Sequence, residues 1–226
     1  MKKSEKNFFK WPLSSIFGIL TFLTELLFTL PAMIMWNLNN PTAFNPLVNW
    51  HSDLGNIDLN LAGHYFYNSG QVVQAVAIIM FAGGLYLIKN KTKIKSVKSS
   101  QIFLILAGIF LMIGGGFFPE TNYDLSLIES STTGGNLSFL MSPHVISSLL
   151  LFVCLSIAIG SLVFKLKKIK GYKTVRIIGI VAFVLNILVL PLNMLFSPPV
   201  VELFAAISAE IFIASIGIKI LIESRK

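Results

Sequence analysis

The chain contains 226 residues, of which 54% are hydrophobic and only 12% are charged, and its net charge is +8. Because soluble domains usually carry about 25% charged residues, this composition excludes an ordinary soluble enzyme and a disordered tail. The single cysteine, Cys154, excludes a disulfide framework and a thiolate metal cluster. The positive charges form short clusters between apolar runs rather than a patch on a globular domain, so nucleic acid is not an expected partner.

Six apolar runs are long enough to cross a bilayer as helices, which takes about 20 residues for a hydrocarbon core of about 30 Å. Irregular backbone cannot face lipid, so the sequence predicts an all-α polytopic membrane protein. Residues 1–226 form one integral membrane domain in this prediction, folded as a six-transmembrane-helix bundle. The approximate spans are 12–35, 71–88, 101–118, 141–164, 175–197 and 203–222.

The basic residues predict how the chain is threaded through the bilayer. With six spans, all 18 Lys and Arg residues fall on one side of the membrane. The positive-inside rule makes that side cytoplasmic. The prediction is therefore a multi-pass protein of the plasma membrane with both termini in the cytoplasm.

The outer loops differ in kind from the short basic connections. The first, at about 36–70, is long and rich in Asn, and part of it is expected to lie flat on the membrane. The second, at about 119–140, contains the glycosylation sequon Asn136-Leu-Ser138. A tight Pro-Pro turn near 197–202 forms the third.

Histidines and carboxylates gather on this outer side without a Lys or Arg to pair with them. Imidazole and carboxylate ligands suit a borderline cation such as zinc, so a divalent metal is a candidate cofactor. A structural interpretation stays open, because topology selection alone depletes Lys and Arg from outer loops, and a histidine after a proline can simply bond a loop carbonyl. The residues of this candidate site are His51, Asp53, His64, Glu120, Asp124 and His144.

Two acidic residues lie near the midpoints of predicted spans, Glu25 in the first and Glu210 in the sixth. A carboxylate at this depth costs about 2.5–3.5 kcal/mol on insertion scales, so it is protonated or partnered. The expected partners are Thr and Ser side chains, Asn186 in the fifth span, or the other carboxylate. Glu25, Asn186 and Glu210 either carry a proton or an ion, or act as neutral residues that pair helices.

Short motifs between Ser52 and Lys168 resemble the domain-of-unknown-function family 998 of six-span prokaryotic membrane proteins. They are Ser52-Asp53-Leu54-Gly55, Phe66-Tyr67-Asn68, the run from Gly114 to Glu120 that ends in Phe-Phe-Pro-Glu, and His144. A more remote likeness is to the Frag1/DRAM/Sfk1 membrane proteins. The resemblance implies six helices and an outer polar site formed by the first two outer loops, and it implies no reaction.

Three functions follow as hypotheses. The first is an outward-facing Asp/Glu/His site that binds a cation, a lipid or a small polar ligand, with or without catalysis. The second is a proton-coupled transporter that uses Glu25 and Glu210. The third is an accessory subunit whose small-residue faces dock another membrane protein or a second copy of this chain. The lipid bilayer is the partner common to all three.

Overall fold

The computed structural model describes residues 12–87, 98–122, 142–196 and 199–224, and the side chains of residues 190–196 are outside the description. This part of the chain is all helix, turn and coil, without a strand, which confirms the all-α prediction. The long helices are α1 (Leu13–Asn39), α2 (Gly63–Leu87), α3 (Lys98–Leu111), α5 (Pro143–Leu166), α6 (Lys173–Phe196) and α7 (Pro199–Ser224). Two short elements accompany them, the 3-10 turn η1 (Ser52–Gly55) and the π-helical turn η2 (Met112–Phe117), which continues α3.

Five helical segments are long and apolar enough to cross a membrane: α1, α2, the continuous stretch Lys98–Phe117, α5 and α7. The sixth long helix, α6, occupies the place of the predicted fifth span. Observed and predicted bounds agree closely except at α2, which begins at Gly63 rather than near residue 71. Its first two turns mix Tyr, Asn and Ser with apolar residues, so hydropathy alone misses them.

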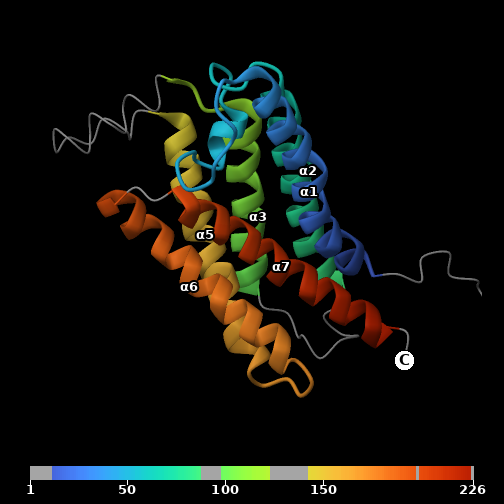
Figure 1. Ribbon diagram of the computed structural model, residues 1–226. Helices are drawn as coiled ribbons and strands as arrows, with labels where there is room; N and C mark the ends of the chain where they lie inside the picture. Colours follow the sequence, from blue (N-terminus) through green and yellow to red (C-terminus); the bar gives the residue numbers. More distant parts are fainter. Residues whose placement is uncertain (1–11, 88–97, 123–141, 197–198, 225–226) are drawn as a thin grey trace, which may run out of the picture.

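The helices form a closed ring in chain order. Each long helix packs against the next one along the chain, and α7 closes the ring by packing against α1 (Figure 1). Small residues permit this closure, because Gly18 of α1 and Gly217 of α7 lie so close that a Cβ on Gly217 would be 2.9 Å from the Ser15 carbonyl oxygen. One end of the ring carries the connection between α1 and α2, and we call it the loop end.

The opposite end, the basic end, carries all the Lys and Arg residues in the described ranges. They are Lys98, Lys165, Lys167, Lys168, Lys170, Lys173, Arg176 and Lys219. Tyr172 ties two parts of this end together, since its hydroxyl donates to Glu223 Oε2 at 3.0 Å and its ring lies 5.4 Å from Lys219 Nζ. The charge asymmetry noted in the sequence is therefore an asymmetry between the two ends of the bundle.

Adjacent glycines on α2 provide a test of the helix packing. A Cβ on Gly84 would collide with the backbone nitrogen of Ser14 in α1, whereas a Cβ on Gly83 would meet no atom within 4 Å. We expect Gly84→Ala to destabilise the protein by about 1–3 kcal/mol, because backbone atoms must move. Gly83→Ala should be neutral or slightly stabilising, because Ala favours the helix by up to about 1 kcal/mol. Unfolding of both variants in detergent measures the difference, and equal stabilities would contradict the observed contact.

Candidate functional site

The connection between α1 and α2 is held in place by asparagine side chains. Asn60 Nδ2 donates to the carbonyl oxygens of Ala32 (3.2 Å) and Leu54 (2.9 Å), and Asn40 Nδ2 donates to Leu59 O (3.1 Å). Asn68 Nδ2 on α2 donates to Gly55 O at 3.0 Å. These bonds tie the connection to the backbone of α1 and to itself. As a result the connection packs into the loop end, with Leu54 fully buried.

This packing places His51 inside the bundle, where it forms an ion pair with Glu25 of α1. The distance between His51 Nε2 and Glu25 Oε1 is 2.9 Å, and the two side chains are 4% and 5% exposed. Thr29 also donates to Glu25 Oε1, at 2.7 Å. Thr29 is among the partner types expected for Glu25, whereas the sequence analysis did not name His51 as its partner. The mid-helix carboxylate is thus joined to the predicted outer site.

Two further contacts fix the position of His51. Its backbone N–H donates to Glu202 Oε2 on α7 at 3.2 Å, and its Nδ1 lies 3.2 Å from the Tyr67 hydroxyl on α2. Burial alone lowers the pKa of His51, but the charge and hydrogen bond of Glu25 and the charge of Glu202 outweigh this, so the pKa lies above its usual value. When it is protonated, the imidazole has a hydrogen on each nitrogen and can donate both to Glu25 and to Tyr67.

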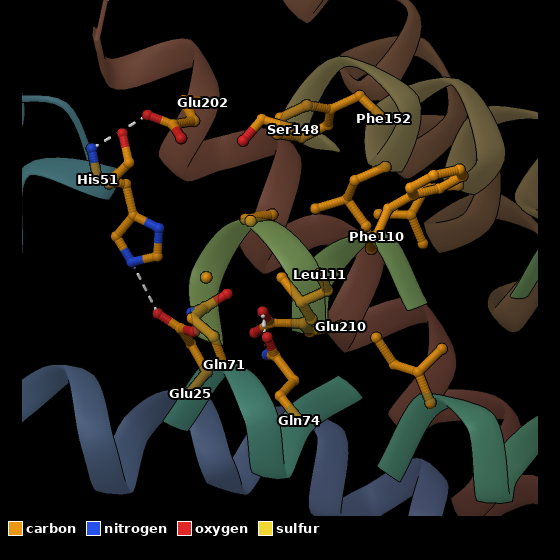
Figure 2. A pocket seen from close by; sticks show the side chains of 18 of the residues that line it. Glu25, His51, Gln71, Gln74, Phe110, Leu111, Ser148, Phe152, Glu202 and Glu210 are labelled. Carbon is orange, nitrogen blue, oxygen red and sulfur yellow. Dashed lines mark hydrogen bonds and ion pairs between the residues drawn. The ribbon is translucent and has the colours of Figure 1, made fainter. Parts of the chain in front are cut away.

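Glu210 of α7 lines the same cavity as His51 and Glu25. Its Oε1 accepts a hydrogen bond of 2.6 Å from Gln74 Nε2 of α2, and Gln74 also donates to Thr21 O at 3.3 Å. Figure 2 shows Gln74 and Glu210 facing each other beside the pair of His51 and Glu25. Both mid-span carboxylates therefore belong to one site.

These residues line a cavity of about 70 Å³, enough for about two water molecules at about 30 Å³ each. It runs from Glu202 in the first turn of α7 to Glu210, about 12 Å along the helix at a rise of about 1.5 Å per residue. Its polar lining consists of Glu25, His51, Ser52, Tyr67, Gln71, Gln74, His144, Ser148, Glu202 and Glu210. The lining comes from α1, η1 and the residue before it, α2, α3, η2, α5 and α7.

His144 lies in this lining and holds the π-helical turn. Its Nδ1 is 3.1 Å from Gly114 O and 3.3 Å from Phe118 O, two acceptors, so Nδ1 carries the hydrogen. Gly114 packs so closely that a Cβ there would meet Ser147 Oγ. A π-helical turn is rare and frequently occurs at functional sites. Here it brings Gly114 and Gly115 to the cavity wall.

The other predicted site residues lie outside the cavity lining. Asp53 is buried in η1, where its Oδ2 accepts from Trp50 N–H at 2.8 Å. His64 packs on Tyr65, and its Nδ1 contacts Asn60 O at 2.9 Å. Glu120 is buried, with its backbone oxygen bonded to Ile57 N–H. In the described ranges no group of three or more His, Cys, Asp or Glu side chains could hold a metal ion.

Three other residues singled out in the sequence are Asn186, Asp124 and Asn136. Asn186 lies on α6, and its Nδ2 donates to Ala182 O and to Ala205 O of α7 (3.0 Å), which is a helix-pairing contact. Asp124 and Asn136 lie outside the described residues. Sequence reasoning missed Tyr67, Gln71 and Gln74, although polar residues at positions i, i+4 and i+7 of an apolar helix mark one face. It also left Glu202 out of the site.

Comparison with known proteins assigns this chain to a family. A family model described as "Protein of unknown function (DUF998)" matches residues 22–220, which is most of the chain. Neither the curated proteins nor the solved structures yielded a match. The matched region contains every residue of the cavity lining.

Proposed function

Because this chain belongs to the family described as Protein of unknown function (DUF998), whose description names no activity, we propose a function from the cavity: the protein binds a small positively charged ligand that enters from the loop end. The ion pair of His51 and Glu25 carries this proposal. It joins the loop residues and the mid-helix carboxylates into a single site inside an apolar bundle.

The proposed membrane topology places this site in the outer half of the bilayer. It consists of six spans, with α6 as the fifth, and of cytoplasmic termini in the plasma membrane. The support is the clustering of the described Lys and Arg residues at the basic end. In this topology the cavity opens toward the outside of the cell.

The charge balance of the cavity favours a cationic ligand. Three carboxylates line it, from Glu25, Glu202 and Glu210, and no Lys or Arg is among its lining residues. The imidazolium of His51 balances one of the three. In a site of low dielectric constant, an excess of carboxylates attracts a cation or a proton.

The core beyond the cavity favours binding rather than passage across the bundle in this conformation. Toward the basic end, the next buried side chains are apolar, among them Phe81 of α2 and Phe212 and Ile216 of α7. Within the described residues, the chain of titratable lining residues ends at Glu210. A transporter would need a second conformation that opens this apolar core.

Thermal unfolding of the detergent-purified protein tests the proposal. Methylammonium chloride should raise the unfolding temperature in a saturable way, while choline chloride at equal ionic strength should not, because the bulkier quaternary nitrogen of choline has no N–H to donate to the cavity carboxylates. At about 100 times the dissociation constant, a ligand stabilises by about 2.7 kcal/mol, a shift of roughly 5–10 °C for a chain of this size.

The variants of this experiment separate the cavity from the rest of α7. The double variant Glu202→Gln/Glu210→Gln should lose the methylammonium effect. Glu223→Gln removes a carboxylate from the basic end of the same helix and should keep the effect. Equal shifts with both salts, or a full response of the double variant, would refute the proposal.

A further inference from the structure

The two carboxylate oxygens of Glu210 have different surroundings. Oε1 accepts the hydrogen bond from Gln74, but Oε2 is buried and has no hydrogen-bond partner among the described residues. The side chain is only 6% exposed and lines the cavity. A buried polar group left in this state destabilises a protein by about 1–3 kcal/mol, and by more if it is charged. The oxygen is therefore available to accept a ligand that enters the cavity.

Small and neutral side chains line the cavity near Glu210, and the charge of Glu25 also acts on its carboxyl group. Ala206 and Ala209, within one turn before Glu210 on α7, line the cavity and leave space beside the carboxylate. Gln71 and Gln74 of α2 supply amide groups without charge. Gln74 is fixed by its second bond, to Thr21 O. This arrangement pre-forms one side of a site before any ligand arrives.

The charge of the site selects the valence of the ligand. Glu25 is balanced by His51, and Glu202 lies at the loop end of α7, bonded to the His51 backbone. Glu210 accepts its hydrogen bond from the side-chain amide of Gln74, which carries no charge. A divalent ion such as calcium takes six to eight oxygen ligands, usually with several carboxylates. No group of three acidic or histidine side chains in the described ranges offers this.

We propose that Glu210, flanked by Gln71 and Gln74, is an inner subsite for one small monovalent cation. The inference rests on the proposed function and names the charge and the position of its ligand. Sodium ions and small primary ammonium ions share this chemistry, and the cavity of about 70 Å³ limits their size. The cation replaces the missing partner of Oε2 and sits deeper than the pair of His51 and Glu25.

Equilibrium binding to the full chain in lipid nanodiscs tests the subsite. The probes are radioactive sodium and radiolabelled methylammonium, each measured alone and against magnesium chloride as competitor. We expect saturable binding of one cation per chain and at least a tenfold loss of affinity in Glu210→Gln, equivalent to about 1.4 kcal/mol. Glu223→Gln, on the same helix, should bind as the unaltered protein does. Glu210→Asp keeps the charge and should lose less affinity than Glu210→Gln.

The outcomes separate the subsite from the proposed function. If Glu202→Gln abolishes binding while Glu210→Gln and Glu210→Asp bind normally, the ligand sits at the mouth and the subsite is wrong, although the cavity still binds a cation. If magnesium displaces both probes more effectively than sodium or methylammonium does, the monovalent assignment is wrong. If neither probe nor magnesium binds saturably, both proposals fail. Preference for one probe identifies the cation class.

Discussion

Replacing His51 with alanine should destabilise the protein by about 3–5 kcal/mol, because Glu25 would remain buried and charged without its partner. Both side chains are at least nine-tenths buried, so bulk water does not solvate Glu25, and water in the adjoining cavity replaces the lost imidazolium only in part. Thr29 would still donate to Glu25, and one neutral hydrogen bond compensates for only part of an unpaired buried charge. The expected effect therefore belongs to the upper range of single substitutions.

His64→Ala is the matched control for this variant. His64 lies in the same part of the chain, is only partly buried, and has its ring Nδ1 2.9 Å from the Asn60 carbonyl oxygen. We expect its replacement to change stability by less than about 1 kcal/mol. Chemical unfolding in a mild detergent, followed by circular dichroism, measures both variants. Equal losses in the two would show that the ion pair contributes nothing beyond an ordinary loop contact.

A double variant isolates the pair itself. His51→Ala combined with Glu25→Gln removes both charges, so the double variant should be more stable than His51→Ala alone. The difference between the summed single effects and the double effect is the coupling energy, which reaches about 0.5–3 kcal/mol for residues in contact. Strict additivity would mean that the two side chains do not interact.

Hydropathy was sufficient to predict the helices, because spans of about 20 apolar residues have few alternatives in a bilayer. It failed at the start of α2, where Tyr65, Tyr67 and Asn68 interrupt the apolar pattern. Tyr67 and Asn68 face the connection rather than lipid, as the contact of Tyr67 with His51 and the bond from Asn68 to Gly55 O show, whereas Tyr65 is exposed. Periodicity of side chains within an element thus carries information that averaged hydropathy loses.

The site was predicted in two separate pieces, an outer cluster and a pair of mid-span carboxylates. The sequence could not join them, because joining them requires the Asn-rich connection to enter the bundle. That entry depends on contacts between distant residues, such as Asn60 with Ala32 and Asn40 with Leu59. With every Lys and Arg assigned to the cytoplasmic side, however, the three histidines were the remaining cationic candidates for Glu25. The structure selects His51.

The second large effect that we expect is a loss of folding stability as pH rises, and it arises from Asp53. Burial raises its pKa from 3.8 to about 7, and the charge of Glu202 adds to this, while the bond from Trp50 N–H opposes it. A pKa raised on folding means that the stabilising contribution is complete below the unfolded value and is lost as pH rises through the folded value. For Asp53 this window extends from about 4 to about 7, and the total is about 4 kcal/mol at about 1.4 kcal/mol per pKa unit.

Asp53→Asn removes this dependence and keeps an oxygen that can accept from Trp50 N–H. Relative to the unaltered protein, the variant should gain about 3 kcal/mol of stability between about pH 5 and about pH 8, where the native Asp53 becomes ionised. Unfolding in detergent across this pH range measures the gain. Asp58→Asn, which removes an exposed carboxylate from the same connection, is the control. Parallel pH profiles for the two variants would contradict the raised pKa of Asp53.

His51, like Asp53, makes the folding stability fall as pH rises, because its pKa is also raised above the ordinary value of 6.5. Its contribution is complete below 6.5 and is lost as pH rises through the higher folded value. Above neutral pH, the same connection therefore loses the imidazolium that pairs with Glu25 and gains a buried carboxylate at Asp53. Hydrogen exchange of residues 40–62, corrected for intrinsic rates, should show their protection falling with pH before that of α2 and α7. In Asp53→Asn the fall should be smaller but still present, since His51 continues to titrate; complete loss of the pH dependence would show that His51 contributes nothing.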